Sequence, residues 1–600
     1  MLKKFTFTGL MLIKNCKGLF ILLLILSTLA SVLASFIPQV IGRMTEILQG
    51  REIASAFPFR YFDTPLAVTV LFIVCGLSQI IFSFAAKVTD KFFQSSLTLE
   101  LKTFLHDKIL SLDAAYHDLH PQNENLFNIN NAAGAVSAVV MAFSLPVSCL
   151  MALTVAVSGL YHALTNVNIP LWLILCIIPA LLAQPFAGHW LGKRINAAFT
   201  KLRANHMEVN GELLNSLKSP VEVQVMNAGK QRSATVRKAL QKVAGMSVKA
   251  NIFAILDSQF SSICILIFQA LIALVIVLCL GDSRDMSAAG SLVTCITLVP
   301  VVFTQTGSFI AIYIQWKQAE PEISAIYNIV KAVNTVQETE NAVNCPADMG
   351  NIAVENVVFG YNGSKNILDG LSVEFPAGKT IAVISRSGGG KSTLLHLLSR
   401  LYDPSSGAIT LQGNNIKNYT LSSLRDSIVR ISQFPLFIQG TLRDNFLLQD
   451  PDAGDEEIED VCRKTGIWEI MAAQSHGKSP LDYPVALGAE NLSGGQRRLL
   501  SISRAMLKMP SLLLLDEPTT GVDARTVQDR IYPFLEEYKK KSSIIFVDHN
   551  MNFVRNLADF VLVIDNGRAA DFGPVEEVLA KKDSLFRALW EEYNRNPVNK

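Results

Sequence analysis

The sequence predicts a membrane bundle of six α-helical spans, followed by an α/β domain built around a phosphate-binding loop. Two observations support this fold class. Six long apolar stretches lie between Gly18 and Tyr313, and an apolar strand, a glycine-rich loop and a helix follow one another within Ile381–Leu401. The composition agrees, because only 17% of the 600 residues are charged, whereas a soluble protein carries about 25%.

Each apolar stretch is long enough to cross the hydrocarbon core of a bilayer, which takes about 20 helical residues. The expected spans are Gly18–Val40, Leu66–Ala86, Val136–Tyr161, Ile169–Trp190, Gln259–Leu280 and Ala289–Tyr313. Lysines precede the first stretch, as in a signal peptide, but no small-residue cleavage site follows cleanly, and we expect a retained helix. The preceding segment, Met1–Lys17, mixes Lys with Phe, Leu and Met, which suits a helix at the membrane surface.

The basic residues around the spans predict their orientation. The N-terminal segment and the two long connections are rich in them, including Lys87, Lys91, Lys102, Lys108, Lys193, Arg194, Lys201, Arg203, Arg237 and Lys238. The short connections on the other side carry Arg43, Arg51, Arg60 and Arg284. Because basic residues concentrate on the cytoplasmic side, we expect a multi-pass protein of the bacterial inner (plasma) membrane with both termini and the C-terminal domain in the cytoplasm.

The two long connections, Lys87–Asn131 and Leu191–Asp257, are rich in helix formers and poor in Gly and Pro. Each fits a helix that leaves the membrane, a short reversal and a returning helix. At 1.5 Å per residue, about twenty residues each way carry the reversal roughly 30 Å into the cytoplasm. Two independent soluble inserts are the alternative, but neither connection has the apolar content for a core of its own. We therefore expect cytoplasmic coupling arms.

Few ionisable side chains lie in the spans, whereas a proton or ion pathway would show buried Asp, Glu or Arg. The polar candidates are Gln39, Gln79, Gln184, His189, Gln269, Gln305 and Gln315. Each glutamine is more typical of an interhelical hydrogen bond than of a substrate contact. This pattern favours an apolar or amphipathic cargo, or a peptide held by its shape.

Charge and cysteine content exclude several function classes. The net charge of +2 gives no strong field that would attract nucleic acid. The nine cysteines form no C-x-x-C pair, and most lie in apolar runs. This pattern predicts small packing residues rather than a disulfide framework or a metal site.

A domain boundary is predicted after the sixth span. The pattern of Lys317–Val336 continues as a helix, the polar stretch Gln337–Gly350 interrupts it, and Ile352–Phe359 has the alternation of a β-strand. We therefore expect a membrane domain at 1–335, a linker at 336–350 and a nucleotide-binding domain at 351–600.

The segment Ile381–Ser392, IAVISRSGGGKS, has the context that a phosphate-binding loop requires. Backbone N–H groups of the turn and the helix N-terminus bind phosphates, Lys391 reaches the β- and γ-phosphates, and Ser392 binds Mg²⁺. The pattern G-x-x-x-x-G-K-S would place glycine at position 385, where this chain has Ser385. The expected ATP-binding residues here are Ser385, Ser387, Gly388, Gly389, Gly390, Lys391, Ser392 and Thr393.

A second motif, Leu512–Glu517, reads LLLLDE and predicts a buried strand that ends in two carboxylates. Asp516 suits indirect binding of Mg²⁺, and Glu517 suits a base that polarises the attacking water. Such runs occur by chance in parallel sheets, but chance becomes the minor explanation about 120 residues after a phosphate-binding loop.

Between these motifs lies LSGGQ at Leu492–Gln496. With this pentapeptide the chain resembles the ATP-binding cassette (ABC) transporters, and the six spans with long arms resemble an exporter-type half-transporter. The resemblance implies that two cassettes close head to tail, with each ATP between one phosphate-binding loop and the partner's signature. It places Ser493, Gly494, Gly495 and Gln496 at the partner's nucleotide.

The resemblance also implies roles for four further residues. Tyr361 in VVFGYNG matches the aromatic residue that stacks on adenine, and Gln433 in RISQFPLF matches the glutamine that contacts Mg²⁺ and water and senses the arms. Asp523 in TTGVD matches the aspartate that links the two sites, and His549 in IIFVDHN matches the switch histidine at the γ-phosphate.

The chain departs from the family pattern in three places: Ser385 replaces a glycine, the stretch LGAEN before the signature is shorter than usual, and TTGVD differs from the common S-A-L-D. These departures affect placement within the family. Phosphoryl transfer depends on positioning and charge neutralisation. The residues that supply both are present: Lys391, Ser392, Asp516, Glu517 and His549.

Together these features predict an ATPase that moves a substrate out of the cytoplasm by alternating access, with ATP and Mg²⁺ at the motor. A second half-transporter is the expected partner; the complete cassette favours a homodimer, and a heterodimer stays open. Three alternatives also stay open: import of a small molecule such as a metal chelate, a lipid or glycolipid flippase, and a channel-like subunit with a vestigial ATPase.

Overall fold

A computed structural model describes residues 16–48, 64–166, 177–217, 220–280, 289–386 and 388–595. The chain divides into two compact units. The first comprises Met1–Leu112 and His120–Ala332, and the second comprises Asp113–Leu119 and Val333–Lys600. Of the earlier expectations, residues 1–15 of the surface helix predicted at Met1–Lys17, the outer residues Arg51, Arg60 and Arg284, and the first part of the fourth span lie outside the described residues.

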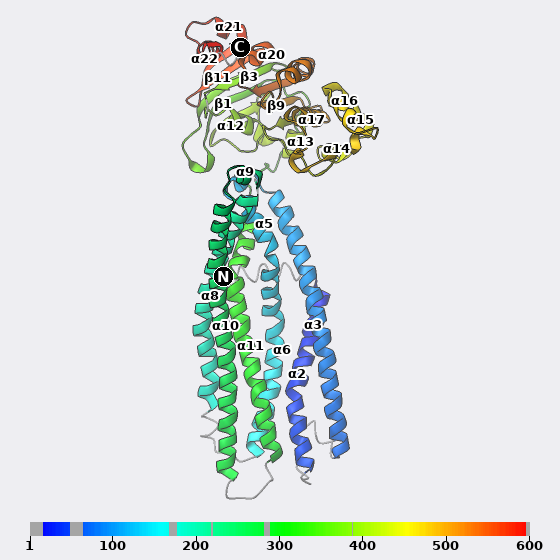
Figure 1. Ribbon diagram of the computed structural model, residues 1–600, viewed down its shortest axis with the longest axis vertical. Helices are drawn as coiled ribbons and strands as arrows, with labels where there is room; N and C mark the ends of the chain where they lie inside the picture. Colours follow the sequence, from blue (N-terminus) through cyan, green and yellow to red (C-terminus); the bar gives the residue numbers. More distant parts are fainter. Residues whose placement is uncertain are drawn as a thin grey trace. The chain divides into compact units, whose positions relative to one another are not determined.

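The first unit is helical and is dominated by long helices that run side by side (Figure 1). Its elements are α2 (Lys17–Leu48), α3 (Pro65–Leu110), α5 (Gln122–Asn130), α6 (Ala132–Asn166), α8 (Ile177–Leu217), α9 (Pro220–Val225), α10 (Gly229–Leu280) and α11 (Ala289–Lys331). Five of the predicted spans fall within α2, α3, α6, α10 and α11, and the described part of the fourth, from Ile177, lies in α8. The membrane part of the fold class is confirmed. Within the described ranges, four stretches are long and apolar enough to cross a membrane: Lys17–Leu48, Pro65–Leu110, Gln122–Ala163 and Val293–Trp316.

Helix α3 illustrates how the sequence suits a membrane helix. Thr64 caps its N-terminus by accepting from the Ala67 N–H, and Pro65 occupies the first turn, where its missing N–H costs nothing. One side is buried, with Val68 and Phe93 inaccessible to solvent. Another side exposes large apolar side chains, as expected of a lipid-facing surface: Leu66, Ile73, Leu77, Ile80, Ile81 and Phe84.

Two of the predicted polar residues bind neighbouring helices. Gln39 on α2 donates to the Val155 carbonyl on α6 at 3.1 Å, and Gln269 on α10 donates to the Ile296 carbonyl on α11 at 3.4 Å. These contacts match the interhelical interpretation of the glutamines. Arg43, expected in an outer connection, instead lies near the end of α2, where it is buried and pairs with Glu46 at 3.3 Å.

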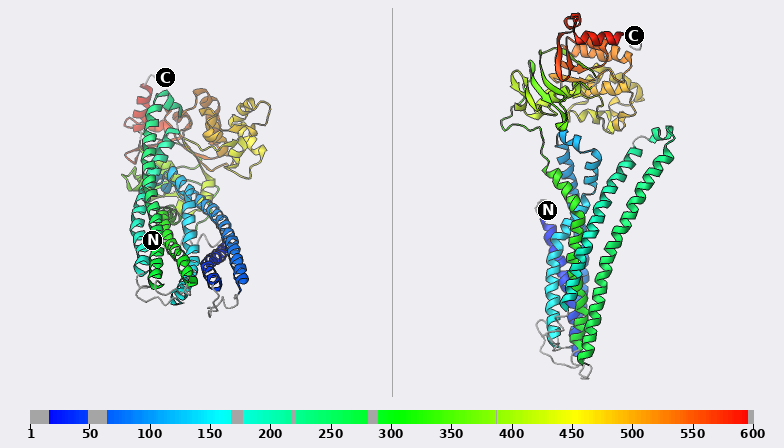
Figure 2. Two further views of the ribbon diagram at one scale, coloured as in Figure 1. Left: turned by 60° about the horizontal axis from the view of Figure 1, so that its bottom comes forward. Right: turned by 90° about the vertical axis from the view of Figure 1, so that its left-hand side faces the viewer.

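Both long connections have the predicted pattern of a helix, a reversal and a helix. The second connection is the simpler, because α8 leads into the one-turn helix α9 and α10 returns alongside α8 (Figure 2). In the first connection α3 ends at Leu110, α4 (Ala114–Leu119) forms the reversal, and α5 begins the return into α6.

The second unit is an α/β domain with two main sheets. The antiparallel sheet has the order β2-β1-β4-β5, and the other has the order β12-β11-β3-β10-β9-β6. The strands are β1 (Ile352–Phe359), β2 (Leu368–Phe375), β3 (Thr380–Ser385), β4 (Ser406–Leu411), β5 (Asn414–Asn415), β6 (Ile428–Ile431), β7 (Gly440–Thr441), β8 (Pro484–Val485), β9 (Leu512–Asp516), β10 (Ser543–Val547), β11 (Phe560–Asp565) and β12 (Arg568–Pro574). Strands β11, β3, β10, β9 and β6 are parallel, and β12 is antiparallel at the edge.

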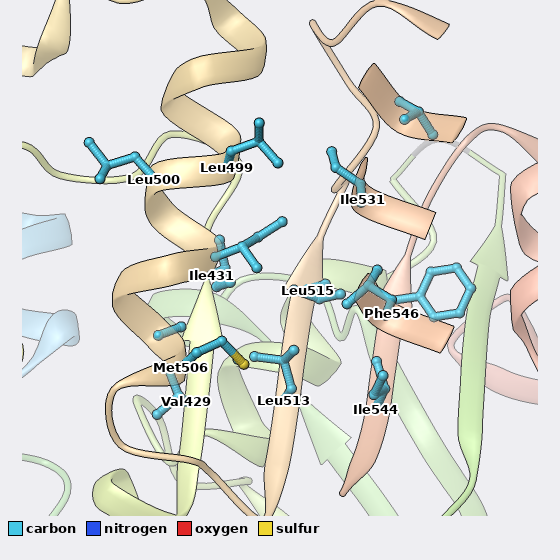
Figure 3. Packing of buried hydrophobic residues seen from close by; sticks show 14 of the residues in the cluster. Val429, Ile431, Leu499, Leu500, Met506, Leu513, Leu515, Ile531, Ile544 and Phe546 are labelled. Carbon is cyan, nitrogen blue, oxygen red and sulfur yellow. The ribbon is translucent and has the colours of Figure 1, made fainter. Parts of the chain in front are cut away.

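Helices pack against both faces of the parallel sheet, so its parallel strands are largely apolar. The helices of this unit after α4 are α12 (Lys391–Leu398), α13 (Leu421–Ser427), α14 (Leu442–Leu447), α15 (Asp455–Thr465), α16 (Ile467–Gln474), α17 (Gly494–Met506), α18 (Ala524–Thr526), α19 (Tyr532–Tyr538), α20 (Met551–Leu557), α21 (Val575–Ala580) and α22 (Leu585–Arg595). On one face, Leu499 and Met506 of α17 pack over β6, β9 and β10 (Figure 3). This packing fixes the strand ends that carry the predicted site.

The short helix α4 belongs to the second unit, although its neighbours in the sequence belong to the first. Asp113 precedes it and accepts hydrogen bonds from the Tyr116 and Val336 N–H groups, both at 3.1 Å, and from the Thr335 hydroxyl at 2.7 Å. At the other end, the Tyr402 hydroxyl donates to Asp118 at 2.5 Å. Polar contacts thus attach both ends of α4 to the α/β domain.

Candidate active site

The predicted motifs converge at one edge of the parallel sheet. Strands β3, β9, β10 and β6 are adjacent and parallel, so their carboxyl ends meet there. The register aligns Val547 with both Val383 and Asp516. The phosphate-binding loop, the two carboxylates of LLLLDE, Gln433 and His549 all follow these strand ends.

The phosphate-binding loop turns through two glycines in left-handed conformations. Gly388 has φ 78° and Gly390 has φ 95°. Gly390 is the N-cap of α12 and provides no side-chain cap, so the first N–H groups of α12 are available to an anion. A Cβ at Gly390 would lie 2.8 Å from Leu368, which excludes larger residues there. Ser387 lies outside the described residues.

Lys391 folds back onto the start of the loop. Its Nζ donates to the Ser385 carbonyl at 3.2 Å and to the Ser385 hydroxyl at 3.3 Å, and that hydroxyl donates to the Arg386 carbonyl at 2.8 Å. Burial lowers the pKa of Lys391, while Glu517 and Asp516 act in the opposite direction. The backbone of Ser385 does not adopt a left-handed conformation. A side chain is therefore tolerated at this position, where the family pattern has glycine.

Ser392 and Asp516, both predicted to lie on the Mg²⁺ side of ATP, contact each other. The Ser392 hydroxyl donates to Asp516 Oδ1 at 3.3 Å, and Arg430 Nη2 donates to Oδ2 at 3.0 Å. No group of three or more His, Cys, Asp and Glu suited to a metal occurs in the described ranges. Mg²⁺ at phosphoryl-transfer sites is held by one or two carboxylates together with phosphate oxygens and waters. The hydroxyl and carboxylate oxygens present therefore fit Mg²⁺.

Glu517 is held by three side chains. Gln433 Nε2 lies 2.6 Å from its Oε2, the Thr520 hydroxyl lies 3.0 Å from the same oxygen, and His549 Nε2 lies 3.1 Å from Oε1. Its backbone has φ 51°, and its N–H donates to the Val547 carbonyl at 2.8 Å. A non-glycine residue in this conformation is strained and is often found at functional sites.

Arg498, the second arginine after the signature, braces the loops that carry Gln433 and Glu517. Its guanidinium donates to the backbone carbonyls of Ser432 at 3.1 Å, Gln433 at 3.3 Å and Glu517 at 3.0 Å. The residue is 5% exposed, and burial lowers its pKa while nearby carboxylates oppose that change. These bonds fix the relative positions of the proposed base and the proposed metal-side glutamine.

Tyr361 lies against the helix that follows the phosphate-binding loop. Its hydroxyl is 2.8 Å from His396 Nδ1 and 3.3 Å from the Thr393 hydroxyl. Its ring packs edge-on against Phe359 and Tyr402, with centroid distances of 5.0 and 5.2 Å. The predicted base-stacking residue is thus part of an aromatic cluster that also contains Tyr402, the partner of Asp118.

The signature makes no hydrogen bond to Glu517 or to the phosphate-binding loop within the described residues. Ser493 is exposed and caps α17, where its hydroxyl accepts from the Gln496 N–H and Gln496 Oε1 accepts from the Ser493 N–H. Gly494 and Gly495 pack closely against Gly521 and Val522, and the Asp523 carboxylate accepts from the Thr526 N–H at 2.8 Å. Among the described residues, no hydrogen bond joins the signature or Asp523 to the phosphate-binding loop.

Three contributors were not identified in the sequence: Arg430, Arg498 and Thr520. Thr520 follows the LLLLDE motif, and Arg498 follows LSGGQ, so proximity to the motifs was their only signal. Arg430 had none, because its contact with Asp516 depends on the pairing of β6 with β9.

Comparison with known proteins agrees with this geometry. A family model described as ABC transporter matches residues 368–520. The chain is 26% identical to an uncharacterized ABC transporter ATP-binding protein, y4gM, of Sinorhizobium fredii, covering 89% of this chain and 88% of that protein. It is 25% identical to an ATM1-type heavy metal exporter of Novosphingobium aromaticivorans, covering 92% and 91%. Its fold matches a bacterial Atm1-family ABC exporter solved with ATP bound, with a TM-score of 0.80 and 22% identity over 97% of this chain and 98% of that one.

Proposed function

This chain is an exporter-type ABC half-transporter with an ATP-hydrolysing cassette, and from this premise we propose that it works as a homodimer that exports a substrate from the cytoplasm by alternating access. The main support is the incomplete site of a single chain. Gln433 and His549 both contact Glu517. Ser493, by contrast, is exposed at the N-terminus of another helix, α17. Two chains arranged head to tail would complete two such sites.

In this proposal each residue group has a distinct task. The N-terminus of α12 and Lys391 bind the phosphates of ATP, and Glu517 accepts the proton of the attacking water. Ser392, Asp516 and Gln433 would hold Mg²⁺, which supplies charge neutralisation at the phosphates. His549 contacts the γ-phosphate, Tyr361 stacks on the base, and Asp523 links the two sites.

The arms transmit closure of the cassettes. Helix α4 is attached to the α/β domain through Asp113 and the bond between Tyr402 and Asp118, while α3 and α5 lead from it into the spans. A displacement of the cassette would therefore act directly on the ends of two membrane helices. Movement driven by ATP binding and reset by hydrolysis would expose the substrate path to each side of the membrane in turn.

We propose an amphipathic small molecule as the cargo, with a metal chelate as the first compound to test. The described spans present apolar side chains and few charges, and a relative over most of this chain is named a heavy metal exporter. The decisive experiment is ATP-dependent uptake into inside-out proteoliposomes, with uptake into right-side-out vesicles as the matched comparison.

Uptake of the metal chelate into inside-out vesicles only, and its loss in Glu517→Gln, is the expected result. Accumulation in right-side-out vesicles would indicate import instead. Translocation of a fluorescent lipid with no uptake of the chelate would identify a flippase, and ATP-independent leakage would identify a channel. Native mass measurement of the chain expressed alone separates homodimer from heterodimer.

A further inference from the structure

Arg430 places a positive charge where the rest of its strand is apolar. Strand β6 consists of Ile428, Val429, Arg430 and Ile431, and the three aliphatic residues are buried. The Arg430 side chain is 17% exposed and reaches Asp516, whose side chain is 8% exposed, with 3.0 Å between Nη2 and Oδ2. The partner comes from the adjacent strand, because β6 pairs in parallel with β9.

Stability alone does not account for this ion pair. Within the part of the chain that is described, the buried Nε of Arg430 has no hydrogen-bond partner. An unsatisfied buried N–H group and a partly desolvated ion pair both cost free energy, and an apolar residue of similar length would carry neither cost. The role of Arg430 therefore has to be sought in what it does to Asp516.

The two oxygens of Asp516 have different neighbours. Oδ2 accepts from Arg430, and Oδ1 lies 3.3 Å from the Ser392 hydroxyl. Arg430 thus holds the carboxylate in one orientation and directs Oδ1 toward the helix that follows the phosphate-binding loop. Its charge also offsets part of the negative charge that Asp516 and Glu517 would otherwise present to a nucleotide.

We propose that Arg430 is a positioning residue for Asp516 that sets how strongly nucleotide binding at this cassette depends on a divalent cation. The inference rests on the proposed assignment of Asp516 to the Mg²⁺ side of ATP. With Arg430 present, ATP binds appreciably before the metal, and the metal adds less. Without it, the more negative site repels free ATP and attracts the metal more strongly.

Among the charged groups near Arg430, Asp516 is the carboxylate that its guanidinium contacts; Asp118 acts on the same two rings as Arg430 but accepts from Tyr402. The guanidinium acts electrostatically on His396 of α12 and on Tyr361. Burial, and then Arg430, lowers the pKa of His396 to about 4, so this ring is neutral at pH 7. Tyr361 is neutral as well, because burial raises its pKa above the ordinary value.

The test uses the full-length chain in nanodiscs, with Glu517→Gln present throughout to prevent hydrolysis. Two quantities are measured: the dissociation constant of TNP-ATP in EDTA, from its fluorescence, and the midpoint for Mn²⁺ binding at saturating ATP, from electron paramagnetic resonance. In Arg430→Met we expect the metal-free dissociation constant to rise, and the Mn²⁺ midpoint to fall, each on the order of tenfold, as for loss of a nearby unit charge. Arg430→Lys keeps the charge and should stay within about threefold of the parent for both.

Arg425→Met on α13 is the matched control, because it removes an arginine near β6 that does not contact Asp516; both quantities should be unchanged. Equal Mn²⁺ midpoints in Arg430→Met and the parent would overturn the proposal, as would Arg430→Lys behaving like Arg430→Met. Asp516→Asn distinguishes a failure of the role proposed for Arg430 from a failure of the metal assignment of Asp516. If it weakens Mn²⁺ binding while Arg430→Met does not change it, only the role of Arg430 fails; if it has no effect, the proposed metal assignment of Asp516 fails. Circular dichroism of each variant confirms that the cassette is folded.

Discussion

Replacing Glu517 with glutamine tests the proposed base most directly. The substitution exchanges one carboxylate oxygen for an NH₂ group of nearly the same size. Its consequence for the folded state follows from the three partners of Glu517: the amide of Gln433, the hydroxyl of Thr520 and the imidazole of His549. All three are groups that both donate and accept hydrogen bonds.

Each partner can therefore adapt to an amide. The Gln433 amide can rotate, the Thr520 hydroxyl can turn, and His549 can change tautomer, so the network survives and we expect a stability change below about 1 kcal/mol. The catalytic consequence is much larger. A general base contributes typically 10²–10⁴-fold to a rate, and the amide cannot accept the proton, so we expect ATP turnover to fall by on the order of 10³-fold.

The assay is phosphate release by the chain in nanodiscs, together with a thermal unfolding curve and retention of labelled ATP after gel filtration. We expect Glu517→Gln to fold normally, to retain ATP and to release very little phosphate. Glu577→Gln, the same change at an exposed carboxylate on α21, should behave as the parent. Turnover within tenfold of the parent would refute the assignment of the base, and a drop of many degrees in the unfolding midpoint would mean that the Glu517 charge is structural.

Three further predictions concern the loop and the attachment of α4. Ser385→Gly should leave ATP affinity unchanged or slightly tighter, because Lys391 keeps its bond to the backbone carbonyl at this position; nucleotide titration would contradict this by revealing a large loss. Tyr402→Phe removes the hydroxyl that donates to Asp118 at 2.5 Å, which should cost about 1 kcal/mol and lower the unfolding midpoint by about 2–4 °C, whereas an unchanged midpoint would mean that the bond contributes nothing. Burial acts to raise the pKa of Asp113, but hydrogen bonds from Thr335, Val336 and Tyr116 outweigh it and hold that pKa below its ordinary value. The stability that ionised Asp113 contributes is therefore present above about pH 4 and is lost as the pH falls further. Asp113→Asn should be less stable than the parent at pH 7, and denaturant titrations should show that the difference in unfolding free energy shrinks below pH 4.

The sequence was most informative where function lies at the ends of strands. An apolar strand followed by Lys391 and Ser392, and another ending in Asp516 and Glu517, are local patterns whose chemistry follows from neighbours in the chain. Parallel pairing then brings such ends together whatever the connections between them. The fold class was predictable for the same reason, since each span and each strand is a local apolar pattern.

The contacts that could not be predicted all depend on register or on distant packing. Arg430 meets Asp516 because β6 lies beside β9 with a particular alignment, which no local pattern encodes. The bond between Tyr402 and Asp118 joins residues 284 positions apart. Arg43 looked like an outer basic residue, and only the extension of α2 to Leu48 makes it a buried partner of Glu46.

The assignment of α4 to the α/β unit has a consequence for synthesis of the protein. Residues 113–119 leave the ribosome roughly 200 residues before Val333 does, so the cassette cannot complete its fold from contiguous chain. A gene fragment starting at Val333 lacks residues 113–119, and with them the partners of the Tyr402 hydroxyl, the Thr335 hydroxyl and the Val336 N–H group. In the folded protein an early-made segment is therefore packed on a late-made domain, and a cassette expressed without that segment should gain stability when residues 113–119 are supplied in trans.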